Sequence, residues 1–201
     1  MQLVSTITTV KIIKKFSQKG VDKQPQKYYN NIRKEIRKGL IIMKKIFLDL
    51  DGTLAKFNVK NALQRFDNEK GFFAKLLAYK GIEIINEMAK AGNVYIISAS
   101  PNEQADVDKI EWVCKYLPNI NLLTNVLICR CGDNKAEYLK SKGLTIDNES
   151  YLLDDYTKNL TEWESAGGVG IKRLTKIADN STGKWKGLAI KQLNELAEAI
   201  A

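Results

Sequence analysis

The chain has 201 residues, of which 44% are hydrophobic, and this is enough to form one folded domain with a substantial core. It contains no histidine, which excludes Ser-His-Asp hydrolases, zinc proteases with histidine ligands and zinc deaminases. The longest apolar runs fall short of the roughly 18 residues of a transmembrane helix, so no membrane partner is expected. The three cysteines have no metal-binding spacing, which is typical of reduced thiols in a cytoplasmic protein.

The net charge of +9 is concentrated at the N-terminus, because residues 1–42 carry ten Lys and Arg against two acidic residues. Three interpretations of this basic extension compete. It is an arm that binds nucleic acid or a membrane surface, or a short helix at 28–40 that packs on the body, or a translation artefact. The third is favoured, since Met43 directly precedes the first strand-like run and the codons of Arg37–Gly39 can form a purine-rich ribosome-binding site. The folded domain is then expected at 43–201, with almost no net charge of its own.

The first predicted strand, Ile46–Leu48, is followed by Asp49, Asp51, Gly52 and Thr53. Side chains two apart on a strand point the same way, so both carboxylates project from its carboxyl end, where open α/β sheets bind ligands. Two carboxylates this close repel each other and require a cation or a shared proton between them. Mg²⁺, which prefers oxygen ligands, is the expected cation. A simple Asp-Gly turn is the plain structural alternative.

A calcium loop also begins with Asp-x-Asp, but it requires Gly at its sixth position and Glu at its twelfth. Counted from Asp49, these positions hold Leu54 and Lys60. The calcium-loop interpretation is therefore excluded.

The rest of the chain alternates between helical and strand patterns. Mixed helical signals at 59–66, 72–77 and 82–91 predict a small helical cap at about 55–92. The elements expected after it are strands at 93–98, 126–131, 151–155 and 169–171, and helices at 102–116, 135–142, 158–166 and, near the C-terminus, 188–200. This order predicts an α/β fold, a Rossmann-like parallel sheet with helices on both faces.

Further polar residues lie where predicted strands end. Ser98 ends one strand, and it has either a functional role or the purely structural role of a turn or helix-cap residue. Ser100 is a second candidate, which can instead cap the next helix. Lys135 begins a helix after a strand and a Gly-Asp-Asn turn, and Lys109 lies on the preceding helix. Either lysine supplies the positive charge that an anionic nucleophile needs to approach a phosphate, although most lysines are solvated surface charges.

Asp154 and Asp155 end the strand at 151–155. Their plain alternative is an N-cap and first-turn charge of the next helix. Adjacent residues on a strand face opposite ways, so one of the two is expected to reach the metal and the other to orient lysine or water. Asp154 is favoured as the metal ligand.

Together these elements resemble the four motifs of the haloacid dehalogenase (HAD) superfamily: Asp49-x-Asp51-x-Thr53, Ser98, Lys135, and Asp154-Asp155. The resemblance implies that Asp49 is the nucleophile that forms an aspartyl-phosphate and that Asp51 is the general acid and base. It also implies that Mg²⁺ is held by Asp49, by the Asp51 carbonyl and by Asp154 or Asp155. Thr53, Ser98 and Lys135 would hold phosphoryl oxygens or the nucleophile, with Lys109 on the substrate phosphate.

Four longer stretches are similar to the cytosolic type C 5′(3′)-deoxyribonucleotidase family: 48–57, 109–113, 152–160 and 183–187. This resemblance implies a cytoplasmic phosphatase that hydrolyses deoxynucleoside monophosphates. Phe57, with Phe72 and Phe73, would stack on the base or form the core of the cap. Tyr156 departs from the Arg of the animal enzymes, and the insertion after the first motif is short.

Three alternatives to a nucleotidase stay open, the first within the same enzyme class and the other two outside it. The chain can be a HAD phosphatase for another small ester such as a sugar phosphate. It can be a nucleic-acid-associated protein that binds through the basic arm, which the nearly neutral body at 43–201 disfavours. It can be an inactive relative that only binds, which the presence of Asp49, Asp51, Lys135 and Asp154 disfavours. The sequence does not predict an oligomeric state.

Overall fold

The computed structural model describes residue 30 and residues 44–57, 71–175 and 185–201. The competing interpretations of the basic extension, and the helix predicted at 59–66, lie outside the described residues. Among the described residues, no helix combines the length and the apolar character needed to cross a bilayer.

The centre of the molecule is a six-stranded sheet in the order β3-β2-β1-β4-β5-β6. All neighbouring strands are parallel. The strands are β1 Lys45–Leu48, β2 Val94–Ser100, β3 Val126–Arg130, β4 Ser150–Asp154, β5 Val169–Arg173 and β6 Leu188–Ile190. The chain runs outward from β1 through β2 to β3 and then returns to the other side of β1 to form β4. This reversal creates a switch point between β1 and β4, and the carboxyl ends of the strands at such a point form a ligand crevice.

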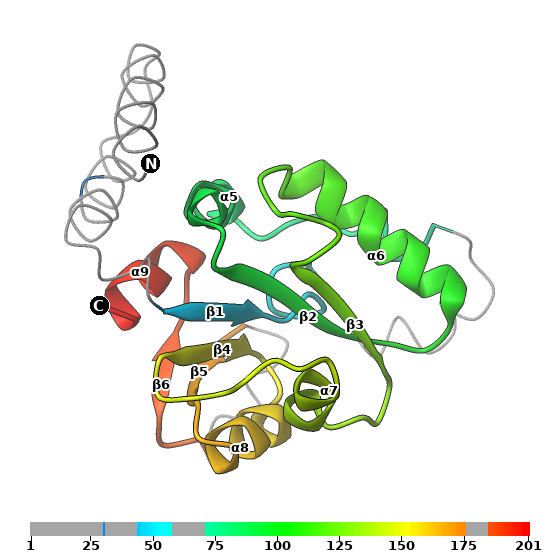
Figure 1. The fold of residues 1–201 in the computed structure, drawn as a ribbon. Helices are drawn as coiled ribbons and strands as arrows, with labels where there is room; N and C mark the ends of the chain where they lie inside the picture. Colours follow the sequence, from blue (N-terminus) through cyan, green and yellow to red (C-terminus); the bar gives the residue numbers. More distant parts are fainter. Residues whose placement is uncertain (1–29, 31–43, 58–70, 176–184) are drawn as a thin grey trace, which may run out of the picture.

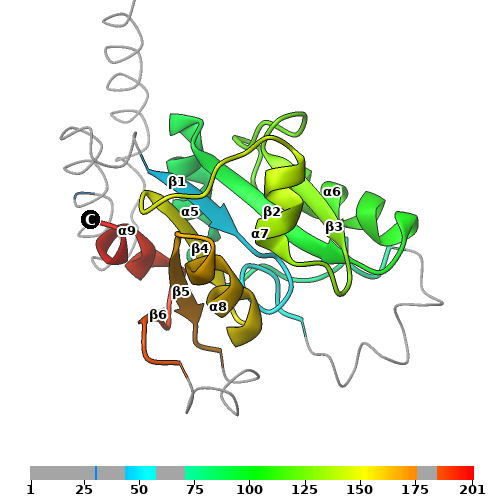
Figure 2. The same cartoon turned by 60° about the horizontal axis from the view of Figure 1, so that its bottom comes forward.

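Helices cover both faces of the sheet (Figures 1 and 2). They are α5 Ile82–Met88, η1 Ala89–Ala91, α6 Glu103–Tyr116, α7 Lys135–Ser141, α8 Thr157–Ser165, η3 Leu193–Glu195 and α9 Leu196–Ala199. On one face α5, α6 and α9 pack with Ile46, Leu48 and Ile96 of the sheet. On the other face α7 and α8 pack around Phe47 and Leu152. The predicted α/β fold with a parallel sheet between two helical layers is confirmed.

Two of the predicted local structures are wrong. Residues 71–75 form turns instead of the helix expected at 72–77, and the backbone of this segment is bound by tertiary partners: Lys56 N donates to the Leu77 carbonyl over 2.8 Å. The tail begins with strand β6 instead of a helix. The periodicity of a short apolar run such as 188–190 does not distinguish a helix from a strand. This run forms a strand because it pairs with β5 at the edge of the sheet.

Helix α5 corrects the expected extent of the cap. The cap was predicted to continue to residue 92, but Ile84, Ile85 and Met88 are buried against the sheet in the main core. Residues 82–91 therefore belong to the body of the domain. Ala55, Leu76, Ala78 and Tyr79 pack with the same core. The part of the predicted cap at 58–70 lies outside the described residues.

Candidate active site

The turn after β1 places the first motif at the switch point. The Leu50 carbonyl accepts from the N–H groups of Leu54 and Ala55, at 2.9 and 2.8 Å, and closes the turn. Gly52 has a φ of +83°, in the left-handed region that favours glycine. A Cβ at Gly52 would lie 2.3 Å from Oδ2 of Asp155. Glycine therefore allows both the turn and the close approach of the β4 end.

Lys135 joins the two strand ends that flank the switch point. Its Nζ donates to Oδ1 of Asp49 over 2.6 Å and to Oδ2 of Asp154 over 2.7 Å. All three residues are buried. Burial acts to lower the pKa of Lys135, but the charges of Asp154 and Asp49 outweigh it and the pKa is raised. Lys135 therefore stays a cation and holds the two carboxylates together.

Asp154 is fixed by two further donors. The Tyr156 N–H donates to Oδ1 over 2.7 Å, and Nδ2 of Asn159 donates to Oδ2 over 2.8 Å. Asn159 was not among the predicted site residues. The sequence signal for Asn159 is its position: it lies in the first turn of α8, four residues after Asp155, where its side chain can reach back to the end of β4.

Asp155 is held by the first motif and by β5. Its N–H donates to Oγ1 of Thr53 over 3.0 Å, and the Thr53 hydroxyl lies 3.4 Å from its Oδ1. Nζ of Lys172 donates to the Asp155 carbonyl over 2.6 Å and to the Thr157 hydroxyl over 2.8 Å. Thr53 was predicted to bind substrate, but its fully buried hydroxyl is engaged with Asp155. This residue therefore positions the β4 end.

The chemistry of the donor set fits a divalent cation. Carboxylate oxygens of Asp49, Asp154 and Asp155 all lie within 4.8 Å of one another. Burial, reinforced by the neighbouring carboxylates, raises the pKa of Asp49 to about 7 and that of Asp155 to about 8. When all three carboxylates are ionised, they carry more negative charge than Lys135 balances. A hard divalent cation, which prefers oxygen ligands, can therefore take the place of the protons. The Asp51 side chain is not in this group, which leaves its carbonyl as the contribution predicted for it.

Asp51 has a separate lysine. Nζ of Lys109, on α6, contacts Oδ2 of Asp51 and donates to Oγ of Ser98 over 2.9 Å. The Asp51 side chain is 19% exposed, whereas that of Lys109 is 1% exposed. Each aspartate of the first motif is therefore paired with its own cation, Asp49 with Lys135 and Asp51 with Lys109.

The two candidate serines have different surroundings, although both are fully buried. Ser98 lies beside the site, where it accepts from Lys109. The Ser100 hydroxyl donates to the Asn102 carbonyl over 3.1 Å. The cap of α6 is the Asn102 side chain, which accepts from the Ala105 N–H over 2.9 Å. Ser98 is therefore brought to the site, and Ser100 supports the start of α6.

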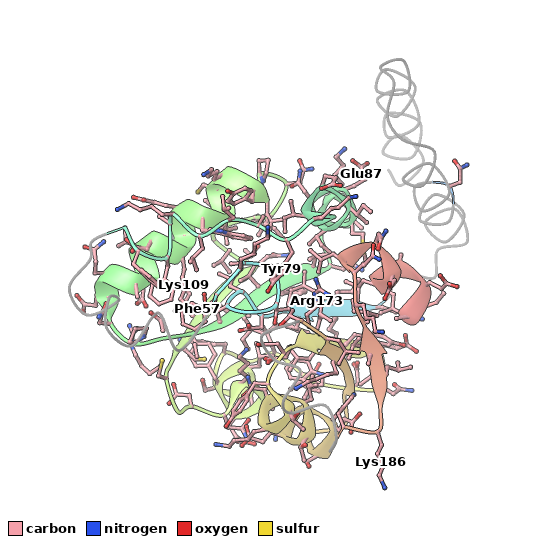
Figure 3. All side chains as sticks on the ribbon, turned by 180° about the vertical axis from the view of Figure 1, so that it is seen from behind. Phe57, Tyr79, Glu87, Lys109, Arg173 and Lys186 are labelled. Atoms are coloured by element: carbon pink, nitrogen blue, oxygen red, sulfur yellow. The ribbon has the colours of Figure 1, made fainter. Side chains whose placement is uncertain are left out.

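Three phenylalanines form a cluster that packs on Lys109, the partner of Asp51. The ring of Phe57 stacks on that of Phe73 at 5.9 Å between centroids, and Phe72 meets Phe73 edge-on at 5.0 Å. The Lys109 Nζ lies 4.7 Å from the centroid of Phe73, and Figure 3 shows Phe57 and Lys109 on the same side of the molecule. The cluster links Phe57 to the residues that follow segment 58–70 in the chain.

Arg173 is a second residue that the sequence did not identify. Its Nε donates to the Thr53 carbonyl over 3.3 Å, and its guanidinium lies 5.0 Å from the centroid of Tyr79 (Figure 3). Burial lowers the pKa of Arg173. The side chain links the first-motif turn to Tyr79. A lone Arg at the end of a strand carries no sequence signal for this contact.

Comparison with known families identifies the chain. The model of the family described as "5' nucleotidase, deoxy (Pyrimidine), cytosolic type C protein" matches residues 48–172, well over half of the sequence. The chain belongs to this family. The match spans the first motif, both lysines and the Asp154-Asp155 pair, so the protein is a HAD-superfamily phosphatase of the 5′-nucleotidase type. A comparison with curated proteins gave no significant match.

Solved structures support the fold of this nucleotidase family member. A HAD-superfamily hydrolase from Ehrlichia chaffeensis has a TM-score of 0.51 and 13% identity, over 78% of this chain and 95% of the other. A D,D-heptose 1,7-bisphosphate phosphatase from B. bronchiseptica, complexed with magnesium and phosphate, has a TM-score of 0.57 and 12% identity, over 78% and 97%. A HAD hydrolase from Entamoeba histolytica reaches 0.54 with 14% identity, over 79% and 99%. At these identities the likeness shows the fold alone.

The raised carboxyl pKa values predict how the stability of the metal-free protein depends on pH. Asp49 and Asp155 bind protons more tightly in the folded protein than in the unfolded chain, where their pKa is 3.8. The stabilisation from these protons is fully present below pH about 4 and is lost as pH rises through about 7 to 8. Each proton contributes a slope of about 1.4 kcal/mol per pH unit within this range.

Urea unfolding in chelator between pH 5 and pH 8 measures this loss. In the Asp155→Asn variant, the free energy of unfolding is expected to fall less steeply with rising pH, by about 1.4 kcal/mol per pH unit, because one proton-binding group is removed. An unchanged slope in the variant would show that Asp155 is not held in a proton-binding cluster.

Proposed function

We propose that this phosphatase is a magnesium-dependent 5′-nucleotidase that hydrolyses deoxynucleoside monophosphates through an aspartyl-phosphate on Asp49. The observation that carries the proposal is the division of the two aspartates between two lysines. Asp49 is buried with Lys135 and the Asp154-Asp155 pair, whereas Asp51 is more exposed and pairs with Lys109, whose ammonium packs on Phe73. The family description names a cytosolic protein, and the proposal includes a cytoplasmic location.

The first step is the attack of Asp49 on phosphorus. Lys135 binds Oδ1 of Asp49, so the attack falls to Oδ2. The new Oδ2–P bond forms as the bond from phosphorus to the ester oxygen breaks, and Asp51 gives its proton to that leaving oxygen. Lys135 and Ser98 are placed to hold the phosphoryl oxygens or the nucleophile.

The second step is the hydrolysis of the aspartyl-phosphate. Asp51, now a carboxylate, takes a proton from the water that attacks phosphorus, and Asp49 is released. A Mg²⁺ ion would be held by carboxylates of Asp49, Asp154 and Asp155 together with the Asp51 carbonyl, and it would supply positive charge to the phosphoryl oxygens. Asn159, Thr53 and Lys172 keep the carboxylates of this set in place.

The substrate class is inferred from the aromatic cluster. Phe73 packs on the ammonium of Lys109, the partner of Asp51, and Phe57 and Phe72 pack on Phe73. A nucleoside leaving group protonated by Asp51 would therefore come close to these rings. An aromatic base gains from such stacking, whereas a sugar phosphate does not. The proposal therefore favours a nucleotide over a sugar phosphate, and a small phosphoester over nucleic acid.

Substitution of the nucleophile tests the mechanism. Asp49→Asn is expected to lower kcat by at least about 10³-fold, because the amide cannot form the covalent intermediate. The measurement is phosphate release from a deoxynucleoside monophosphate with Mg²⁺. Glu137→Gln, which changes an exposed carboxylate on α7, serves as the control and should retain activity. Wild-type turnover in Asp49→Asn would contradict the covalent mechanism.

Substitution in the aromatic cluster tests the substrate class. Loss of base stacking costs about 1–3 kcal/mol, so Phe57→Ala should raise KM for deoxynucleotides at least about 5-fold. The KM for a sugar phosphate should change little. Steady-state kinetics on ribo- and deoxynucleoside monophosphates and on sugar phosphates, each with Mg²⁺ or with chelator, provide the comparison. Wild-type hydrolysis confined to sugar phosphates would reject the nucleotide assignment and keep the phosphatase.

A further inference from the structure

Lys109 has no donor left for a substrate. A lysine ammonium carries three N–H donors, and Lys109 Nζ has three acceptors: Oδ2 of Asp51, Oγ of Ser98 at 2.9 Å and the Ala99 carbonyl at 2.5 Å. The side chain is 1% exposed. A phosphoryl oxygen could bind Lys109 only by displacing one of these buried contacts. The sequence-based prediction that Lys109 binds the substrate phosphate is therefore not supported by its contacts.

Helix α6 also binds the backbone of residues 73–76. Asp108, the neighbour of Lys109, accepts from the Phe73 N–H over 3.3 Å and from Nε2 of Gln104 over 2.9 Å. One turn later, Nε1 of Trp112 donates to the Leu76 carbonyl over 2.8 Å. The Phe73 ring in turn packs against the Lys109 ammonium. Asp51 and the aromatic segment are thus fixed to one rigid element within two helical turns.

We propose that Lys109 is a positioning residue for Asp51. Through Lys109, helix α6 keeps the acid/base carboxylate of Asp51 aligned with residues 73–76, which carry the Phe73 ring. This inference rests on the proposed function. Lys109 engages Oδ2 of Asp51, so Oδ1 is the atom that faces the leaving oxygen. There it gives a proton as the ester P–O bond breaks and later takes one from the attacking water. The lysine itself transfers no proton and binds no phosphate.

The test separates positioning from phosphate binding by comparing Lys109→Met with Lys109→Arg. For Lys109→Met, kcat on a deoxynucleoside monophosphate should fall about 100-fold, since misplaced general acid–base groups forfeit about 10²–10⁴ in rate. The dissociation constant of inorganic phosphate, measured by calorimetry with Mg²⁺, should stay within about 3-fold of wild type. Lys109→Arg, which keeps a cation beside Asp51, should recover part of kcat.

A second test compares two substrates whose leaving groups differ in their need for a proton. A purely structural role of Lys109 would affect the hydrolysis of both substrates equally. Dinitrophenyl phosphate releases an anion that needs no proton, so the first burst of dinitrophenolate should be almost unaffected in Lys109→Met while nucleotide hydrolysis is slow. Lys115→Met, an exposed position on the same helix, is the matched control and should behave as wild type.

Two results would overturn the inference. Loss of a charge-assisted bond to phosphate costs about 1.5–3 kcal/mol, so a rise of 10-fold or more in the phosphate dissociation constant would make Lys109 a phosphate ligand. An equal loss on nucleotide and dinitrophenyl esters would show general damage to the site. Phosphate binding decides the first question even if the substrate panel shows no turnover. That absence of turnover would count against the proposed function alone.

Discussion

The repulsion between carboxylates at the β1–β4 switch point is the constraint on which the site depends. Asp49, Asp154 and Asp155 are brought within 4.8 Å of one another in a buried setting. Such an arrangement persists only because cations and hydrogen-bond donors offset its charge. Lys135 bridges Asp49 and Asp154, and Asn159 donates to the same Oδ2 of Asp154. The Tyr156 N–H and the Thr53 hydroxyl donate to further carboxylate oxygens, Oδ1 of Asp154 and Oδ1 of Asp155. The remaining negative charge suits a metal ion, whose own positive charge would offset that of a phosphate.

The fold supplies this crowding through its strand order. The register between β1 and β4 pairs Leu48 with Leu153, so the acidic residues that follow each strand leave the sheet at the same level. Lys172 is the β5 partner of Asp154 and reaches the backbone beyond it. Gly52 lets the first-motif turn approach Asp155 closely enough for the carboxylates to meet. A parallel sheet with an outward and a returning half thus builds the site from residues that are about 100 positions apart.

Much of the site could be predicted because strand ends are visible in a sequence. Asp49 follows a predicted strand and Lys135 begins a predicted helix. Ser98 and Asp154 lie at the ends of predicted strands, and parallel strands place such residues at one edge of the sheet. The actual partners could not be predicted. Lys109 pairs with Asp51, Thr53 with Asp155, and Arg173 with the first-motif turn through tertiary distances that no local pattern encodes. The same holds for β6, whose three residues become a strand only through pairing with β5.

The charge imbalance at the switch point is the central claim, and Mg²⁺ binding to the full chain tests it most directly. Isothermal titration of the metal-free protein near pH 7 should show one ion bound per chain with a rise in melting temperature, because binding to the folded state alone stabilises it. In Asp155→Asn, which removes one of the three carboxylates, the affinity should fall at least about 10-fold, equivalent to about 1.4 kcal/mol. Equal affinity in the variant, or no binding and an unchanged melting temperature in the wild type, would contradict the account.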